Sequence, residues 1–206
     1  MPTAPTQAQA RTSTPRLTHA DSRAPKVLDA AAHLFCRQGY EGTSVRDIAR
    51  AVGMLPGSLY CHFATKEELL VAVYRRGVEQ ICAAVADAVE RKSEPWERLE
   101  AACVAHLESI LRDDDYARVV VRVRPADVAA VGTTLVAERD RYEALWTSLV
   151  AALPLPRRTD RKALRLMLLG ALNWSQNWYR PDGGASPRSL ARQFTALLRQ
   201  GMEIPA

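Results

Sequence analysis

The stretch that decides the fold reads Thr43-Ser-Val-Arg-Asp-Ile-Ala-Arg-Ala-Val-Gly53, then a short turn, then Pro56-Gly-Ser-Leu-Tyr-Cys-His-Phe63 and Thr65-Lys-Glu-Glu68. Ser44 lies three residues before Asp47, and apolar residues follow at helical spacing. A hydroxyl and a carboxylate at this spacing form a capping box, so the pattern predicts a helix with one apolar face that ends at Gly53.

A second, very short helix is predicted after the turn. Leu59 and Phe63 are four residues apart and can anchor it on one side. The other side then carries small and polar groups: Gly57, Ser58, Tyr60 and His62. Such groups suit close approach to phosphates and base edges in the major groove, so the two helices are interpreted as a helix-turn-helix.

A third helix is predicted to begin directly afterwards. Thr65 and Glu68 have the spacing of another capping box, which places Lys66 in the first helical turn. The amide groups of a helix N-terminus attract anions, so Lys66 is expected to hold a DNA phosphate there.

This arrangement resembles the DNA-binding domain of the TetR family of bacterial transcriptional regulators, over residues 24–70. The residues that carry the resemblance keep the family's order and spacing: Ala31 to Phe35, Gly39-Tyr40, Thr43-Ser44-Val45, Ile48-Ala49, Gly53, Gly57, Leu59-Tyr60, His62-Phe63 and Lys66 to Leu69. The resemblance implies that Thr43, Tyr60 and Lys66 hold phosphates. It also implies a base-facing set, with Ser44 and Gly57 beside it on the same surface: Arg46, Pro56, Ser58 and His62.

The chain departs from the family at Leu55 and Pro56, where many members carry a capping serine and a polar or basic residue. Proline is accepted in a first helical turn because its missing N–H has no helical partner there.

Length and composition exclude several classes of protein. The chain has 206 residues, 48% of them hydrophobic, enough for a small head and a larger body. No apolar run of about 18 residues and no signal region occurs, so we expect a cytoplasmic protein without a membrane partner. The four cysteines form no C-x-x-C pair and the four histidines no metal set, so neither a metal nor a cofactor is expected.

Three parts are predicted along the chain. Residues 1–23 are rich in Pro, Thr and Ala with few large apolar side chains, which predicts a flexible tail that is either inert or a minor-groove arm. Residues 24–69 form the helix-turn-helix domain. Residues 70–206 form an effector-binding and dimerisation domain, so the fold class is all-α.

The body reads as a series of helices. The segment Tyr116 to Arg124 holds three consecutive valines and leaves helix and strand open. The segment Ala163 to Trp174 is apolar nearly all round and must be covered on both sides. We expect it to pair with the last helix and with their copies in a homodimer; a monomer with a thicker body is the alternative. The expected interface residues are Leu168, Leu172, Phe194 and Leu198.

An effector pocket is predicted from aromatic and amide residues in the body. Trp174 and Trp178 are four residues apart, Asn177 lies between them, and Trp146 is on another helix. Aromatic walls with a few amides are typical of a small-molecule pocket, although the tryptophans could equally fill the core or the dimer interface. Other candidates for the pocket are His106, Tyr142, Arg118 and Arg122, with His106 also suited to a hydrogen-bonded place in the core.

The arginines near this pocket favour an anionic effector that is otherwise apolar, and an acyl-CoA is one such molecule. The segment around Trp174 is also similar to TetR-family members that respond to acyl-CoA intermediates. A cationic drug, as in regulators of efflux, needs buried carboxylates, for which Glu108 and Glu138 are the nearest candidates.

The sequence therefore predicts a repressor that leaves a palindromic, double-stranded DNA operator when its effector makes the long helix from Lys66 swing the heads apart. An enzyme is the chief alternative class, but no H-E-x-x-H, G-x-S-x-G, P-loop or Rossmann motif is present. A helical adaptor would leave the exposed polar face of the second helix unexplained.

Overall fold

The computed structural model describes residues 23–112 and 114–202, and within these ranges every regular element is helical. The α-helices are α1 (Ala24–Gln38), α2 (Val45–Ala51), α3 (Pro56–Tyr60), α4 (Lys66–Glu90), α5 (Pro95–Leu111), α6 (Asp115–Arg122), α7 (Gly132–Ala151), α8 (Arg161–Trp174) and α9 (Pro187–Met202). Two 3₁₀ turns are η1 (Pro125–Asp127) and η2 (Ser175–Asn177). The all-α prediction is confirmed, whereas the predicted tail lies outside the described residues except for Arg23.

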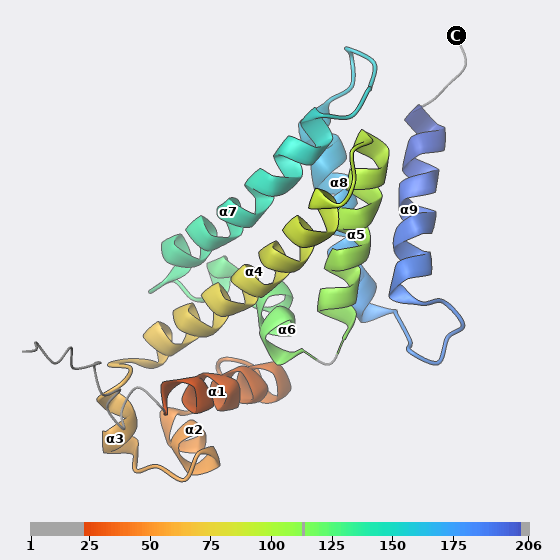
Figure 1. The fold of residues 1–206 in the computed structure, drawn as a ribbon. Coiled ribbons are helices and arrows are strands. Elements are labelled where there is room, and N and C mark those ends of the chain that lie inside the picture. Colours follow the sequence, from red (N-terminus) through yellow and green to blue (C-terminus); the bar gives the residue numbers. More distant parts are fainter. Residues whose placement is uncertain (1–22, 113, 203–206) are drawn as a thin grey trace, which may run out of the picture.

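Helices α1, α2 and α3 form a small head at one end of the molecule (Figure 1). The predicted capping box of α2 is present, because the Ser44 hydroxyl accepts from the Asp47 amide while the Asp47 carboxylate accepts from the Ser44 amide. Gly39 and Gly53 end α1 and α2 with φ angles of 78° and 65°, which L-residues with a side chain rarely adopt.

The cap of α4 differs in one detail from the prediction. The Thr65 hydroxyl accepts from the Glu68 amide, as expected, but the Glu68 carboxylate accepts from the amide of Ala64 and not from that of Thr65. The carboxylate therefore fixes the residue before the cap, which sets the angle at which the chain enters α4.

Helix α4 runs from the head into the body, where α5 lies at the centre of the remaining helices (Figure 1). The segment that left helix and strand open is helical: the Asp114 carboxylate accepts from the amides of Tyr116 and Ala117 and thereby caps α6. Helix α6 packs against α1 on one side and against α4 on another. The head is therefore in contact with α6 as well as with α4, which also packs on α1.

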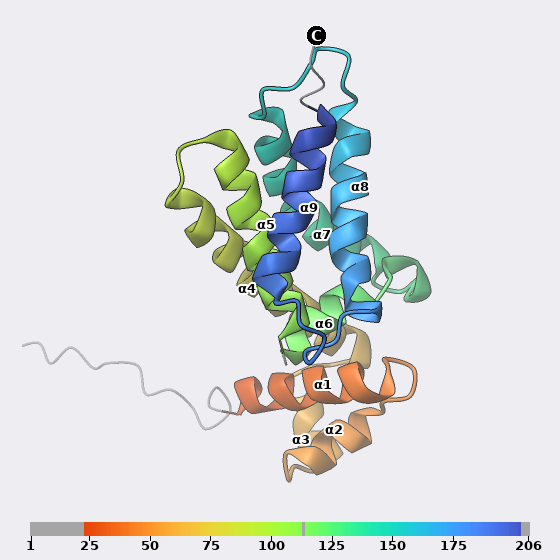
Figure 2. The same ribbon diagram turned by 90° about the vertical axis from the view of Figure 1, so that its right-hand side faces the viewer.

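Helices α8 and α9 run antiparallel, side by side, on one face of the body (Figure 2). Different sides of the apolar helix α8 face the core, a cavity and the outside of the subunit. Leu164, Leu168 and Leu172 are buried in the core. Leu166, Leu169 and Gly170 line a cavity, and Met167, Ala171 and Trp174 face outward. A helix that is apolar all round is thus covered on two sides here and open on the third.

Candidate DNA-binding surface and effector cavity

The short helix α3 presents the polar face that the sequence predicts. Leu59 is fully buried and holds the helix on the head, while Gly57, Ser58 and Tyr60 are exposed, Tyr60 at 50%. Pro56 and His62 are half-buried at the two ends of this face. The hydroxyl groups and the imidazole are therefore accessible to a nucleic-acid partner.

Helix α2 adds two of the predicted residues, Ser44 and Arg46, both exposed. Arg46 makes no ion pair with any residue in the described ranges, unlike its neighbour Arg50, which binds Asp47 at 3.2 Å. A guanidinium without an internal partner is available to a phosphate or a guanine.

Two residues expected on phosphates are instead directed inward. The Thr43 side chain is buried and its hydroxyl donates to the Gly39 carbonyl at 2.8 Å. The Lys66 ammonium donates to the carbonyl oxygens of Tyr40 and Thr43 at 3.0 and 3.2 Å and lies 4.0 Å from the centre of the Tyr40 ring. In this conformation Lys66 joins the turn after α1 to the start of α4, whereas the Thr43 hydroxyl closes that turn on the end of α1.

Leu55, which departs from the family pattern, is one of the most accessible apolar side chains of the described chain, at 75%. It precedes α3 directly and therefore borders the same face. Its exposure could have been predicted from its position directly before Pro56, because a side chain at the N-cap of so short a helix has no core to enter.

The body holds a cavity of about 340 Å³ between α4, α5, α6, α7 and α8. Its walls are largely apolar, and the polar residues His106, Tyr142 and Asn173 are on its lining. Among the side chains that line it are Tyr74, Ile81, Val120, Val121, Leu166 and Leu169, together with Arg124, Arg139 and Glu143. This volume and this mixture of surfaces suit a small organic ligand.

His106 connects three helices at this cavity. Its Nδ1 lies 2.6 Å from the Tyr142 hydroxyl and its Nε2 lies 3.0 Å from Asn173 Oδ1. Burial lowers the pKa of His106 to about 4, although the Asn173 amide opposes this, so the imidazole is neutral at physiological pH. Burial also raises the pKa of Tyr142 well above its usual value. The group is therefore polar but uncharged.

Trp146 lies behind His106 and Tyr142, with ring centres 5.7 and 6.1 Å away in edge-to-face contact. It is fully buried, and its indole nitrogen has no hydrogen-bond partner in the described chain. Trp146, predicted to line the pocket, lies behind the cavity wall and is not among the residues that line this cavity.

Three other predicted pocket residues do not reach the cavity. Trp174 and Trp178 are exposed at 66% and 48%, and Asn177 is also exposed and donates to the Trp174 carbonyl. The prediction assumed one continuous helix, but α8 ends at Trp174 and the chain continues as a 3₁₀ turn. The amide that reaches the cavity is that of Asn173.

Arg118 and Arg122 also lie away from the cavity. Arg122 donates to the Cys36 carbonyl of α1 at 3.0 Å, and the charge of Arg118 acts on the Cys36 thiol. The arginines at the cavity are Arg124 and Arg139, whose exposed side chains mark its solvent side. Residues adjacent in α6 point in different directions, so spacing in the sequence did not reveal which arginine reaches the ligand space.

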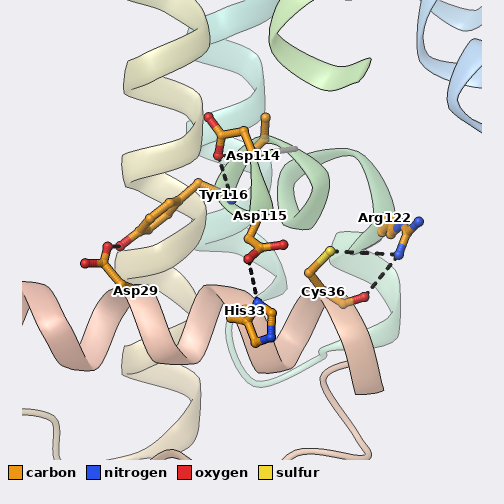
Figure 3. A network of polar contacts seen from close by, with 8 residues as sticks. Asp29, His33, Cys36, Asp114, Asp115, Tyr116 and Arg122 are labelled. Atoms are coloured by element: carbon orange, nitrogen blue, oxygen red, sulfur yellow. Dashed lines mark hydrogen bonds and ion pairs between the residues drawn. The ribbon is translucent and has the colours of Figure 1, made fainter. Parts of the chain in front are cut away.

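Helix α6 is joined to α1 by a set of polar contacts (Figure 3). The Tyr116 hydroxyl donates to Asp29 Oδ1 at 2.7 Å, and His33 Nδ1 lies 2.9 Å from Asp115 Oδ2. Burial and, second, the Asp29 carboxylate raise the pKa of Tyr116, so its hydroxyl stays protonated as a donor. Together with Arg122 these contacts join the head to α6.

A groove of about 370 Å³ runs along α8 and α9 and is lined almost entirely by apolar side chains. Met167 and Leu197 are exposed at 59% and 67%, and Phe194 is half-buried. Leu168, Leu172 and Leu198, which were expected at a dimer interface, are buried within the subunit. Leu168, Leu198 and half-buried Phe194 nevertheless line this groove, so the exposed apolar face includes three of the four expected residues, together with Met167 and Leu197.

An all-helical chain with a helix-turn-helix head and a cavity in its body is a DNA-binding transcriptional regulator. Two family profiles match it, "Bacterial regulatory proteins, tetR family" over residues 27–73 and "Tetracyclin repressor-like, C-terminal domain" over residues 92–202. The chain belongs to the TetR family. None of the described helices is both long and apolar enough to cross a membrane.

Individual relatives cover nearly the whole chain. The HTH-type transcriptional repressor KstR2 of Mycobacterium tuberculosis is 30% identical over 190 residues, which is 88% of this chain and 94% of that protein. AibR, solved with isovaleryl coenzyme A and operator DNA, superposes with a TM-score of 0.75 at 26% identity over 85% of this chain and 97% of AibR. PfmR of Thermus thermophilus gives a TM-score of 0.72 at 29% identity, covering 86% of this chain and 99% of PfmR.

Proposed function

We propose that this regulator is a repressor whose operator complex is released when a small molecule enters the cavity between α4 and α8. One observation carries the proposal: α6 lines the cavity with Val120 and Val121 and also holds the head through Tyr116, Asp115 and Arg122. A ligand that displaces α6 therefore changes how the head is held. It shifts the population away from the DNA-bound form in proportion to its preference for the other form.

The cavity favours an effector with an apolar part and an anionic part. Its walls offer valine, leucine and isoleucine side chains, and Arg124 and Arg139 lie at its solvent side. An acyl-CoA fits this division, with the acyl group inside and the phosphates outside, and AibR, which resembles this chain, was solved with such a ligand. Burial of the acyl group contributes about 0.8 kcal/mol of favourable binding free energy for each methylene.

A cationic effector finds less support in the cavity. Glu143 is the only carboxylate on its lining within the described residues, and Arg139 and Arg165 both pair with it. Glu108 and Glu138 lie outside the lining, and each already binds arginines on the surface. A cation would have to displace an arginine from an existing ion pair, and its binding would be weakened by the loss of the interaction between that arginine and its carboxylate.

The regulator acts as a homodimer in this proposal, with residues 24–69 as the DNA-binding head and 70–206 as the effector-binding and dimerising body. The exposed apolar groove of α8 and α9 supports a two-fold interface, because solvent contact of such a patch is unfavourable. A two-fold dimer presents two α3 helices to a palindrome with half-sites about one helical turn apart or a multiple of it.

The test is a titration of the complex between the protein and DNA from upstream of its own gene. Isovaleryl-CoA, its free acid, coenzyme A alone and a cationic dye are added while DNA release is followed by fluorescence anisotropy. We expect release by the thioester and not by coenzyme A. Release by the dye alone would overturn the effector class, and failure to bind any DNA from the region would overturn the role as its local repressor.

A further inference from the structure

The inner surface of the cavity carries an uncharged hydrogen-bonding group in an otherwise apolar wall. His106 comes from α5, Tyr142 from α7 and Asn173 from α8, so three separate helices bring these side chains together. All three line the cavity. A buried histidine needs hydrogen-bond partners. That need does not explain why the partners lie on the wall of a ligand-sized cavity.

The hydrogen-bond directions leave specific groups available. The Nε2–H of His106 donates to Asn173 Oδ1, so its Nδ1 accepts the Tyr142 proton. The Asn173 amide nitrogen then keeps two protons, and it has no hydrogen-bond partner in the described chain. The Tyr142 oxygen keeps lone pairs that can accept. The wall therefore offers one free donor group and one free acceptor, both neutral.

The uncharged polar groups and the charged groups of the cavity differ in their exposure to solvent. His106 and Tyr142 are buried, and fully buried Trp146 backs them with its indole ring. The charged side chains Arg124 and Arg139 are largely exposed and lie on the solvent side. A carboxylate at the inner wall would lose its water shell and meet no cation there, whereas a ketone or hydroxyl would lose less and gain a hydrogen bond.

We propose that Asn173 and Tyr142 are specificity-determining residues that recognise an uncharged oxygen, a carbonyl or a hydroxyl, on the apolar part of the effector. The proposal rests on the proposed function, because it uses the same cavity. It narrows the effector to molecules whose buried skeleton carries such an oxygen and excludes those with a second carboxylate at that end. A plain hydrocarbon group leaves the Asn173 amide without a partner.

Three matched probes test this: cyclohexanecarbonyl-CoA, 4-oxocyclohexanecarbonyl-CoA and trans-4-carboxycyclohexanecarbonyl-CoA. They share the ring and the coenzyme and differ at the ring position opposite the thioester. Binding is followed by tryptophan fluorescence and by release of operator DNA. On the natural protein we expect the oxo probe to act at about three- to tenfold lower concentration than the hydrocarbon probe, the range for one hydrogen bond to a neutral group. The carboxylate probe should be the weakest.

Variants separate recognition from folding. Asn173→Leu removes the donor, keeps similar volume and should bring the ratio between the oxo and hydrocarbon probes close to one. Tyr142→Phe removes the acceptor, which a ketone cannot use because it has no proton to donate; this variant should keep that ratio and weaken binding of the 4-hydroxy analogue instead. Leu169→Met, on the same lining, changes shape without polarity and should keep the natural ratio. Because each ratio is measured within one protein, a loss of stability common to both probes cancels.

Each outcome has a distinct meaning. Equal action of the oxo and hydrocarbon probes on the natural protein overturns this inference alone. Preference for the oxo probe that persists in Asn173→Leu also overturns it. If none of the three thioesters perturbs fluorescence or releases DNA, the effector class of the proposed function is wrong, and the inference falls with it.

Discussion

Gly77 in α4 and Tyr116 in α6 lie so close together that a methyl group on Gly77 would come within 2.6 Å of the Tyr116 carbonyl oxygen and 2.7 Å of Val120. The α4 backbone at Gly77 thus packs directly on the α6 backbone at Tyr116 and on the Val120 side chain. Since α6 also lines the cavity and holds α1, the glycine sets the position of the helix on which both depend.

Gly77→Ala is expected to lower the free energy of unfolding by about 1–3 kcal/mol, because overpacking forces backbone movement that outweighs the gain of about 1 kcal/mol in helix propensity. Urea denaturation measures it. Gly170→Ala in α8 is the matched control, since a methyl group there meets no atom within 4 Å and should leave stability equal or higher. Equal stability of the two variants would contradict the close contact between α4 and α6.

Tyr116→Phe is expected to loosen the head from α6, because it removes the hydrogen bond to Asp29. Asp29 is exposed and can take water instead, so the cost should be near 1 kcal/mol. Hydrogen exchange should rise at the amides of α1 and stay unchanged in α9. Tyr179→Phe is the control, since that hydroxyl makes no hydrogen bond in the described ranges. The same hydrogen-exchange pattern in both variants would contradict the prediction.

Arg46→Ala and Lys66→Ala should weaken DNA binding for different reasons. Arg46 is exposed and unpaired among the described residues, so its loss should reduce the salt dependence of binding by up to about one unit of slope if it contacts a phosphate. Lys66 holds two backbone carbonyls, so its loss should lower thermal stability and leave the slope nearly unchanged. Anisotropy titrations from low to moderate salt measure the slopes. Identical slopes for natural protein and Arg46→Ala would remove Arg46 from the phosphate contacts.

Leu197→Glu is expected to yield monomers with weak operator binding, because it places a charge on the exposed apolar groove of α8 and α9. The side chain is exposed in the single chain, so its replacement should not unfold the subunit. Ala83→Glu adds the same charge at an exposed position of α4 and should stay dimeric. Sedimentation at micromolar concentration distinguishes the two, and a dimeric Leu197→Glu protein would place the interface elsewhere.

His106 should make stability fall as the solution is acidified. Its pKa is lowered from 6.5 to about 4 in the folded chain, so between these values the unfolded chain binds more protons at this residue than the folded chain. The free energy of unfolding therefore rises with pH in this window, by up to about 1.4 kcal/mol per unit from this group. Chemical denaturation at pH 4.5 and pH 7 of the natural protein and His106→Gln measures the difference. A pH dependence that is the same in both would show that His106 does not contribute.

The head could be predicted closely from the sequence. Capping boxes, glycine stops and the anchor at Leu59 act between residues a few positions apart, so their outcome hardly depends on the rest of the chain. The inward turn of Lys66 was not predictable in this way, because its acceptors at Tyr40 and Thr43 lie 26 and 23 positions earlier.

The sequence by itself determined the all-helical class, the helix-turn-helix and the helix pair that carries the exposed apolar face. Only the tertiary structure decided which side of each body helix faces the core, the cavity or solvent. The four-residue spacing of Trp174 and Trp178 is compatible with a pocket, but the helix ends between them. His106, Tyr142 and Asn173 are 36 and 31 positions apart in turn, and only the packing of α5, α7 and α8 brings them together. Periodicity shows that a helix is apolar, whereas its neighbours, distant in sequence, determine what that apolar surface meets.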